Sequence, residues 1–258
     1  MDARPIGIFD SGMGGLTVAQ EISKILPNES MVYVGDTAYA PYGQRTPLEV
    51  AQRSNIIVEF LLTQGAKAVV IACGTATALA LAPLTAQFTN VPIVDVINPC
   101  VQRLATQYTG RLGLIATTAT INGGMFGQLL GNRLVAAQAC PLFAPMAEAG
   151  LNSTHPAVNF AAGVYLTPLR GKLDSLILGC THYPLFASAI KTAIGDIKLI
   201  NMGSFTAAAL KQTLESNGLT NTGTANLHRF YVTGSTQAFC AAGGKIYKEV
   251  LDTCKITL

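Results

Sequence analysis

Short apolar runs alternate along the chain with longer amphipathic stretches. The runs have the length and β-branched content of buried strands, whereas the stretches between them have the spacing of helices. Nine runs predict strands, at residues 6–9, 31–34, 68–72, 93–95, 111–115, 133–137, 174–178, 198–200 and 229–232. Because strands that alternate with helices form parallel sheets covered on both faces, the pattern predicts an α/β fold.

One predicted helix has a clear start. Thr46 is a candidate N-cap, Pro47 fits the first helical position, and Glu49 completes the spacing of a capping box. The apolar spacing that follows extends this helix to about Gln64.

The uncharged stretch 68–94 is the one candidate for a membrane span. It contains Gly74, Pro83 and Pro92, and its β-branched start gives way to an Ala/Leu-rich stretch. These features predict a strand, a turn, a helix and a second strand rather than a spanning helix. The first residues have too short an apolar run for a signal peptide, so we expect a cytoplasmic protein that does not enter a membrane.

A weak internal repeat divides the chain into two similar parts. IGIFDS at 6–11 resembles LGLIAT at 112–117, and VVIACGT at 69–75 resembles LILGCTH at 176–182. Within each pair the two segments are separated by nearly the same number of residues, and the two pairs occur in the same order along the chain. This pattern indicates a duplicated fold. Ligands bind beyond the carboxyl ends of parallel strands, so two facing halves would direct Cys73 and Cys180 into one cleft.

Composition narrows the classes of function. Charged residues make up 12% of the chain and hydrophobic residues 50%, so much surface is expected to be buried in the core or in a homo-oligomer. The net charge of +3 is scattered, which argues against a nucleic-acid-binding protein. The cysteines and histidines have no metal-ligand spacing, so we expect no metal site, and without a secretory signal the thiols should be reduced.

A single buried cysteine usually packs in the core, but two thiols on opposite walls of a polar cleft suit a different task. One thiolate can remove a proton from a carbon while the opposite thiol returns one to the other face, which inverts a stereocentre without a cofactor. Asp10 and Ser11 stand at a glycine-rich turn that could receive an anion, and His182 follows Cys180 closely enough to polarise it.

Two other interpretations fit the motifs less well. Asp36 has the place of a ribose-binding acid after the glycine-rich turn, but Thr17 occupies the position of the third glycine in a dinucleotide-binding motif, and there is no P-loop lysine. A hydrolase that uses Cys73 as nucleophile would need an activating histidine, and none is close to Cys73 in the sequence.

Five segments in order resemble the glutamate racemases of the aspartate/glutamate racemase superfamily: DSGMGGLTV, GDTAYAPYGQRTP, ACGTA, CPLFAPMAEAG and GCTHYPL. The resemblance covers nearly the whole chain. It implies two pseudo-symmetric, doubly wound α/β domains with mainly parallel sheets and the active site in the cleft between them. By this resemblance, residues 1–97 and 206–258 form the first domain and 98–205 the second.

The resemblance also implies roles for individual residues. Cys73 and Cys180 would be the two acid/base residues, assisted by Asp10, His182 and Glu148. The substrate-binding set would be Ser11, Pro41, Tyr42, Gly43, Gly74, Thr75, Thr117, Thr118 and Thr181. The family commonly has asparagine where this chain has Gly74, so a hydrogen bond to the substrate would be lost and turnover weakened.

The function implied is the cofactor-independent interconversion of L- and D-glutamate, which supplies D-glutamate for peptidoglycan, by a cytoplasmic homodimer. Two alternatives stay open at this point. The protein could racemise another amino acid such as aspartate, with Gly74 providing room. It could also be a weakly active member with a binding role, since some members of the family bind DNA gyrase.

Overall fold

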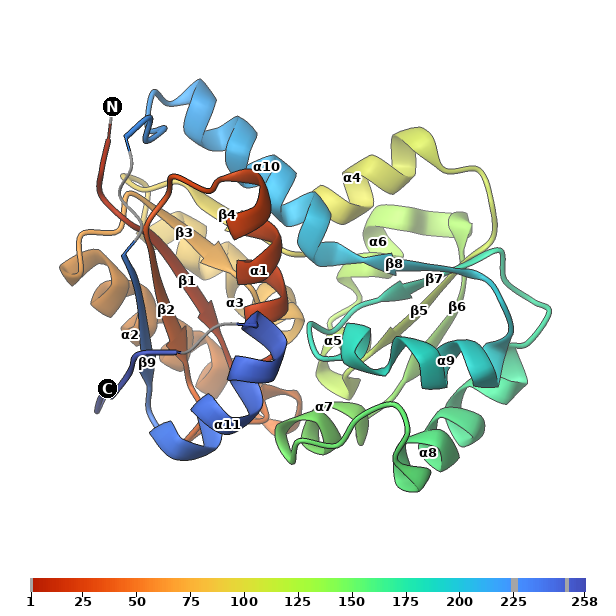
Figure 1. Cartoon of the computed structure of the whole chain (residues 1–258). Coiled ribbons are helices and arrows are strands. Elements are labelled where there is room, and N and C mark those ends of the chain that lie inside the picture. The colour runs from red at the N-terminus through yellow and green to blue at the C-terminus, as the bar shows by residue number, and fades with distance from the viewer. Residues whose placement is uncertain (1, 224–226, 249–250) are drawn as a thin grey trace.

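The computed structural model describes residues 2–223, 227–248 and 251–258 and contains two parallel sheets (Figure 1). The first sheet has the strand order β10-β9-β2-β1-β3-β4 and the second the order β6-β5-β7-β8. All neighbouring strands in both sheets are parallel. The predicted α/β class is therefore confirmed.

All nine predicted strands are present, with ends displaced by at most two residues. The strands are β1 Ile6–Asp10, β2 Met31–Gly35, β3 Ala68–Ile71, β4 Ile93–Asp95, β5 Leu112–Ala116, β6 Leu134–Ala139, β7 Ser175–Leu178, β8 Lys198–Asn201, β9 His228–Val232 and β10 Thr253–Lys255. β10 was not predicted from the sequence. It is a three-residue edge strand that has no buried residue and therefore no apolar run.

The helices lie between the strands and on both faces of the sheets. Their bounds are α1 Leu16–Ile25, α2 Pro47–Thr63, α3 Gly74–Gln87, α4 Asn98–Gln107, α5 Thr118–Asn122, α6 Met125–Leu130, α7 Phe143–Glu148, α8 Pro156–Leu166, α9 Ala187–Ile194, α10 Met202–Ser216 and α11 Thr236–Tyr247. The predicted capping box of α2 is confirmed: the Glu49 amide donates to Thr46 Oγ1 at 3.2 Å, and the Thr46 amide donates to Glu49 Oε2 at 2.8 Å.

The uncharged stretch 68–94 forms β3, α3 and β4, as predicted. Across the residues that the structure describes, the search for a helix with both the length and the apolar character of a membrane span finds none.

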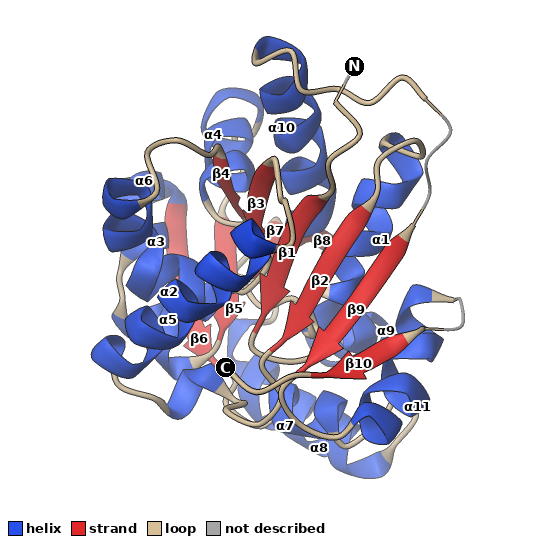
Figure 2. Ribbon diagram, turned by 90° about the vertical axis from the view of Figure 1, so that its left-hand side faces the viewer, coloured by secondary structure: helices blue, strands red, loops and turns tan. Residues whose placement is uncertain are grey.

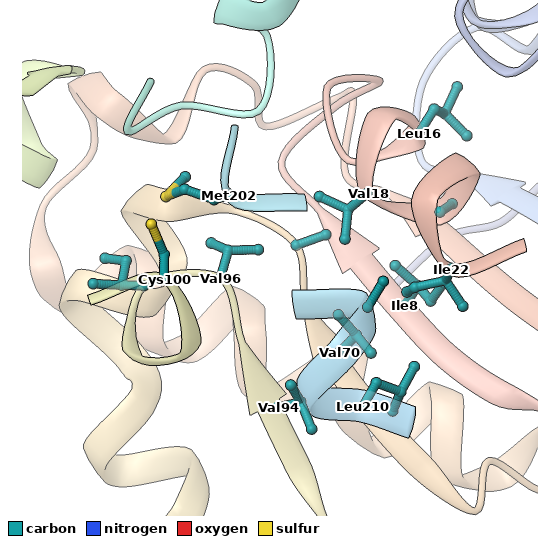
Figure 3. Packing of buried hydrophobic residues seen from close by; sticks show 14 of the residues in the cluster. Ile8, Leu16, Val18, Ile22, Val70, Val94, Val96, Cys100, Met202 and Leu210 are labelled. Carbon is teal, nitrogen blue, oxygen red and sulfur yellow. The ribbon is translucent and has the colours of Figure 1, made fainter. Parts of the chain in front are cut away.

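Alternation along the strands explains why helices cover both faces of the first sheet. Ile8 and Val70 point to one face, where they pack with residues of α1 and α10 (Figure 3). Phe9 and Ile71 point to the other face and pack with α2 and α3. Side chains that alternate in a strand point to opposite faces, so both faces carry a hydrophobic core.

The two sheets share one topology, as the internal repeat predicts. The order β2-β1-β3-β4 in the first sheet corresponds to β6-β5-β7-β8 in the second, with β1 matching β5 and β3 matching β7. β9 and β10, from the C-terminal part of the chain, extend the first sheet beyond β2 (Figure 2). The chain therefore leaves the first sheet after β4, builds the second sheet, and returns.

Candidate active site

Polar and nucleophilic side chains gather at the carboxyl ends of four strands. Asp10 is the last residue of β1, and Cys73 follows β3 by two residues. In the second sheet, Thr117 comes directly after β5, and Cys180 follows β7 by two residues. In the first sheet β1 lies between β2 and β3, and in the second β5 lies between β6 and β7, so the strand order reverses at β1 and at β5. Open parallel sheets bind ligands at such a reversal.

These residues line a single cavity between the two sheets. Thirteen of the fourteen predicted site residues line it: Asp10, Ser11, Pro41, Tyr42, Gly43, Cys73, Gly74, Thr75, Thr117, Glu148, Cys180, Thr181 and His182; Ala40 and Ala144 complete the lining. The cavity volume is about 20 Å³, close to the space of one water molecule. A larger ligand can enter only if the walls separate.

Cys73 is the N-cap of α3, so its sulfur lies at the positive end of the helix. Sγ accepts a hydrogen bond from the Ala76 amide at 3.4 Å and donates to Ser11 Oγ at 3.7 Å. Burial nevertheless raises the pKa of this thiol to about 12, and the nearby Asp10 carboxylate acts in the same direction. Without a bound cation, Cys73 is therefore a neutral thiol near pH 7.

Asp10 lies beneath the glycine-rich loop and is 1% exposed. Its Oδ1 accepts a hydrogen bond from the Gly15 amide at 2.8 Å, whereas Oδ2 has no hydrogen-bond partner. Burial raises the pKa of Asp10 to about 6, although the neighbouring His182 opposes the shift. A carboxyl group with this pKa can exchange a proton with a neighbouring group near neutral pH.

Cys180 belongs to a chain of three side chains. Its Sγ lies 3.6 Å from His182 Nδ1, and His182 Nε2 lies 2.7 Å from Glu148 Oε1. Burial alone would lower the pKa of His182, but the hydrogen bonds to Cys180 and Glu148 outweigh it and raise this pKa well above its usual value. The histidine therefore favours its protonated form near neutral pH.

Three threonine hydroxyls meet between the halves. Thr75 Oγ1 lies 2.9 Å from Thr117 Oγ1, and Thr120 Oγ1 lies 2.9 Å from that of Thr117 and 3.3 Å from that of Thr75. Thr120 was not predicted from the sequence; it lies three residues after Thr117, the N-cap of α5, and this i, i+3 spacing is the signal that could have found it. Thr118 was expected in the substrate-binding set, but its side chain is exposed and does not line the cavity.

The loop that carries Pro41, Tyr42 and Gly43 is held from behind by Asp36. Tyr42 Oη donates to Asp36 Oδ2 at 2.6 Å, and Arg53 pairs with the same carboxylate at 2.9 Å. Asp36 is completely buried. Its oxygens bind protein groups, which removes it as the ribose-binding acid of a nucleotide site.

Gly74 brings the two walls into close contact. A Cβ atom at this position would lie 2.6 Å from the carbonyl oxygen of Gly179, which is next to Cys180. A distance this short is far below van der Waals contact, so no side chain fits without movement of the backbone.

The arrangement places two thiols, each next to a titratable partner, on opposite walls of one enclosed polar cavity. No group of His, Cys, Asp or Glu side chains in the described ranges could hold a metal ion. A duplicated α/β fold with paired thiols defines a class of enzymes that exchange protons on both faces of a carbon atom.

Comparison with known proteins specifies this class. The family model described as Asp/Glu/Hydantoin racemase matches residues 6–210, and the chain belongs to this family of racemases. The glutamate racemase of Corynebacterium diphtheriae is 44% identical over 220 residues, which cover 83% of this chain and 82% of that protein. The glutamate racemase of Streptococcus pneumoniae strain Hungary19A-6 is 40% identical over 260 residues, which cover 97% of each chain.

Solved structures agree with these matches. The glutamate racemase from Francisella tularensis, solved in complex with D-glutamate, superposes with a TM-score of 0.92 at 36% identity and covers 100% of this chain and 98% of that one. The aspartate racemase from Picrophilus torridus has a TM-score of 0.57 at 18% identity and covers 83% of this chain and 94% of that chain, which shows a shared fold alone.

Proposed function

We propose that this protein interconverts L- and D-glutamate without a cofactor, through Cys73 and Cys180. The observation that carries the proposal is that these two thiols stand at equivalent positions of a duplicated fold and line the same cavity. The substrate assignment rests on the relatives named glutamate racemase at 40–44% identity. These relatives favour glutamate over aspartate as the substrate.

In the proposed reaction, one cysteine acts as a thiolate and removes the proton from Cα of one enantiomer. The electron pair of the broken C–H bond is held as a carbanion stabilised by the neighbouring carboxylate, and the opposite thiol donates its proton to the other face. The two cysteines exchange protonation states in each turnover, so the reverse reaction starts with the other thiolate. No electrons or groups are gained or lost.

The neighbours of each thiol support different ways to form the thiolate. On the first wall, the α-ammonium group of the substrate would offset the burial that raises the pKa of Cys73, and Asp10 could hold the proton. On the second wall, the His182 cation already faces Cys180. Backbone amides and hydroxyl groups of Ser11, Thr75, Thr117 and Thr181 would bind the two carboxylates.

Deuterium exchange tests the proposal directly. Wild-type protein incubated in D₂O with either enantiomer should cause loss of optical rotation and incorporate deuterium at Cα of the product. Cys73→Ala and Cys180→Ala should each abolish racemisation. Retention of both optical rotation and protium by folded wild-type protein would contradict the proposal.

We also propose the domain boundaries that the resemblance implies, residues 1–97 with 206–258 and residues 98–205. The return of β9 and β10 to the first sheet supports this division. We further propose that the protein is a cytoplasmic homodimer that supplies D-glutamate for peptidoglycan. The exposed apolar side chains of Phe160 and Val164 on α8 support the dimer. Binding to DNA gyrase is not part of the proposal, because no feature of the described residues argues for it.

A further inference from the structure

The segment at residues 12–17 of the first half, which comprises the glycine-rich loop and the first two residues of α1, contacts the acid/base residues of the second half. The Met13 amide donates a hydrogen bond to Glu148 Oε1 at 3.0 Å. Thr17 Oγ1 lies 3.0 Å from the carbonyl oxygen of Thr181, which is next to Cys180, and 2.9 Å from the carbonyl oxygen of Gly14 in its own half, and it can donate its one proton to either. The Met13 bond and the Thr17–Thr181 contact therefore cross from one wall of the cavity to the other.

The glycines of this loop are explained by space rather than by backbone conformation. A Cβ atom at Gly12 would overlap Oε1 of Glu148, and one at Gly14 would lie 2.5 Å from His182 Nδ1. Neither glycine has the positive φ that favours glycine elsewhere in the described chain. The absence of side chains therefore lets the loop backbone reach Glu148 and His182.

The Met13 bond acts on the oxygen that orients the histidine. Glu148 Oε1 accepts from Met13 of the first half and lies 2.7 Å from Nε2 of His182 in the second. His182 in turn contacts Cys180 through its other ring nitrogen. On the Cys73 side, the Asp10 carboxylate accepts its bond from Gly15, which belongs to its own half. The hydrogen-bond partners of Cys73, Ser11 and the Ala76 amide, also belong to the first half. The contacts made by residues 12–17 across the cavity thus bear on the Cys180 side, whereas Thr75 makes the cross-cavity contacts near Cys73.

The cavity is small in this structure. Its volume of about 20 Å³ is too small for an amino acid, so the site has to widen when a substrate enters or leaves. Widening between the two halves would break the contacts of Met13 and Thr17, and closure would make them again.

We propose that the segment at residues 12–17 is a positioning element that fixes the Glu148–His182–Cys180 chain when the two halves close on the substrate. Glu148 then gains the Met13 bond that holds it against His182 only after the substrate is enclosed, whereas Cys73 keeps its partners in both states. This inference rests on the proposed function and adds an asymmetry between the two thiols.

Thr17→Val tests the inference, because valine has the shape of threonine but cannot donate to Thr181. Thr17→Ser is the matched control that keeps the hydroxyl group. The probes are the two enantiomers of a single diastereomer of 3-chloroglutamate: a thiolate removes the Cα proton, a Cα–Cβ double bond forms, and chloride leaves with its electron pair. This elimination needs only the thiol that faces the proton, so Cys73→Ala and Cys180→Ala show which enantiomer reports on which thiol.

Thr17→Val should slow chloride release from the Cys180-dependent enantiomer about tenfold through kcat, as expected for the loss of one hydrogen bond. Release from the Cys73-dependent enantiomer should not change, and Thr17→Ser should behave as wild type. Gly12→Ala, which displaces Glu148, should show the same selectivity. Thermal unfolding of each variant checks that it is folded.

An equal loss for both enantiomers, or no loss for either, in the folded variants would overturn the inference. Failure of the proposed function gives a different result: wild-type protein would neither exchange deuterium into glutamate nor release chloride in a thiol-dependent way.

Discussion

Asp10 is a carboxylate at a position where its charge is costly. The side chain is almost completely buried, and Oδ2 has no hydrogen-bond partner. Burial therefore raises its pKa to about 6, compared with about 3.9 for an unfolded chain. The same carboxylate lies near Cys73, where it can accept a proton in the proposed reaction. Burial of Asp10 therefore lowers the stability of the fold at a position proposed to serve catalysis.

Asp10→Asn should be more stable than wild type at neutral pH. Between the unfolded and the folded pKa the native state binds the extra proton, so this carboxyl lowers the free energy of unfolding as pH rises from about 4 to about 6. Asparagine has no such titration. Urea unfolding should show a gain for Asp10→Asn of up to about 3 kcal/mol at pH 7 that shrinks towards pH 4, while racemisation is lost. Parallel pH profiles for the two proteins would contradict this assignment.

At the scale of elements, the start of α3 and the end of β7 meet without a side chain between them. Gly74 is the first residue of α3, and the Gly179 carbonyl lies where its Cβ would be. The sequence suggested that glycine here merely removes a contact with the substrate. The structure adds that glycine sets the distance between the two walls.

Gly74→Ala should lower kcat/KM by about tenfold or more, because the added Cβ pushes Cys73 and Cys180 apart and catalysis is sensitive to small displacements. Gly163→Ala is the matched control: this glycine is also helical, in α8, but a Cβ there would meet nothing within 4 Å. It should keep full activity, since alanine only improves helix propensity. Equal activities of the two variants would show that the contact at Gly74 does not matter.

At the scale of the whole molecule, Arg53 joins parts of the chain that are far apart in sequence. It pairs with the buried Asp36 behind Tyr42 and donates to the carbonyl of Leu258 at 2.9 Å. Thr233, at the end of β9, donates to the same carboxylate at 2.8 Å. This cluster fixes the C-terminal strands to the loop that lines the active site.

Arg53→Met should destabilise the protein by about 3 kcal/mol, because it leaves the Asp36 carboxylate buried without its cation. Arg111→Met removes the ion pair between Arg111 and Asp174, whose side chains are 54% and 45% exposed, respectively. Because this pair is exposed, its loss should lower the free energy of unfolding by about 1 kcal/mol or less. Urea unfolding of both variants at neutral pH measures the difference. Similar losses of stability in the two variants would mean that the buried pair of Arg53 and Asp36 is not a main link between the C-terminal strands and the loop that carries Tyr42.

The duplication is also a property of the whole molecule. Each half supplies one thiol from the same place in the same strand order, so neither half has both of the thiols proposed as acid/base groups. One hydrophobic cluster extends across both halves, from Ile8 in β1 to Leu114 in β5 and Ile177 in β7. The proposed boundary at residue 206 falls inside α10, which packs on α1 and α4. The two halves are therefore closely joined on the side where α10 lies.

The sequence by itself determined nine of the described strands, the start of α2 and the duplicated topology, because these depend on local patterns: apolar runs mark the strands, Thr46 and Glu49 mark a helix start, and the repeat aligns Cys73 with Cys180. Of the thirteen predicted residues that line the cavity, four came only from the resemblance to glutamate racemases: Gly74, Thr75, Thr117 and Glu148. β10 was missed because a short, exposed edge strand has no apolar run. Only the tertiary structure decided which groups meet across the cavity, namely Met13 with Glu148, Gly74 with Gly179, and Thr120 with Thr75. These contacts join residues far apart in the chain, and local spacing carries no information about how the two sheets face each other.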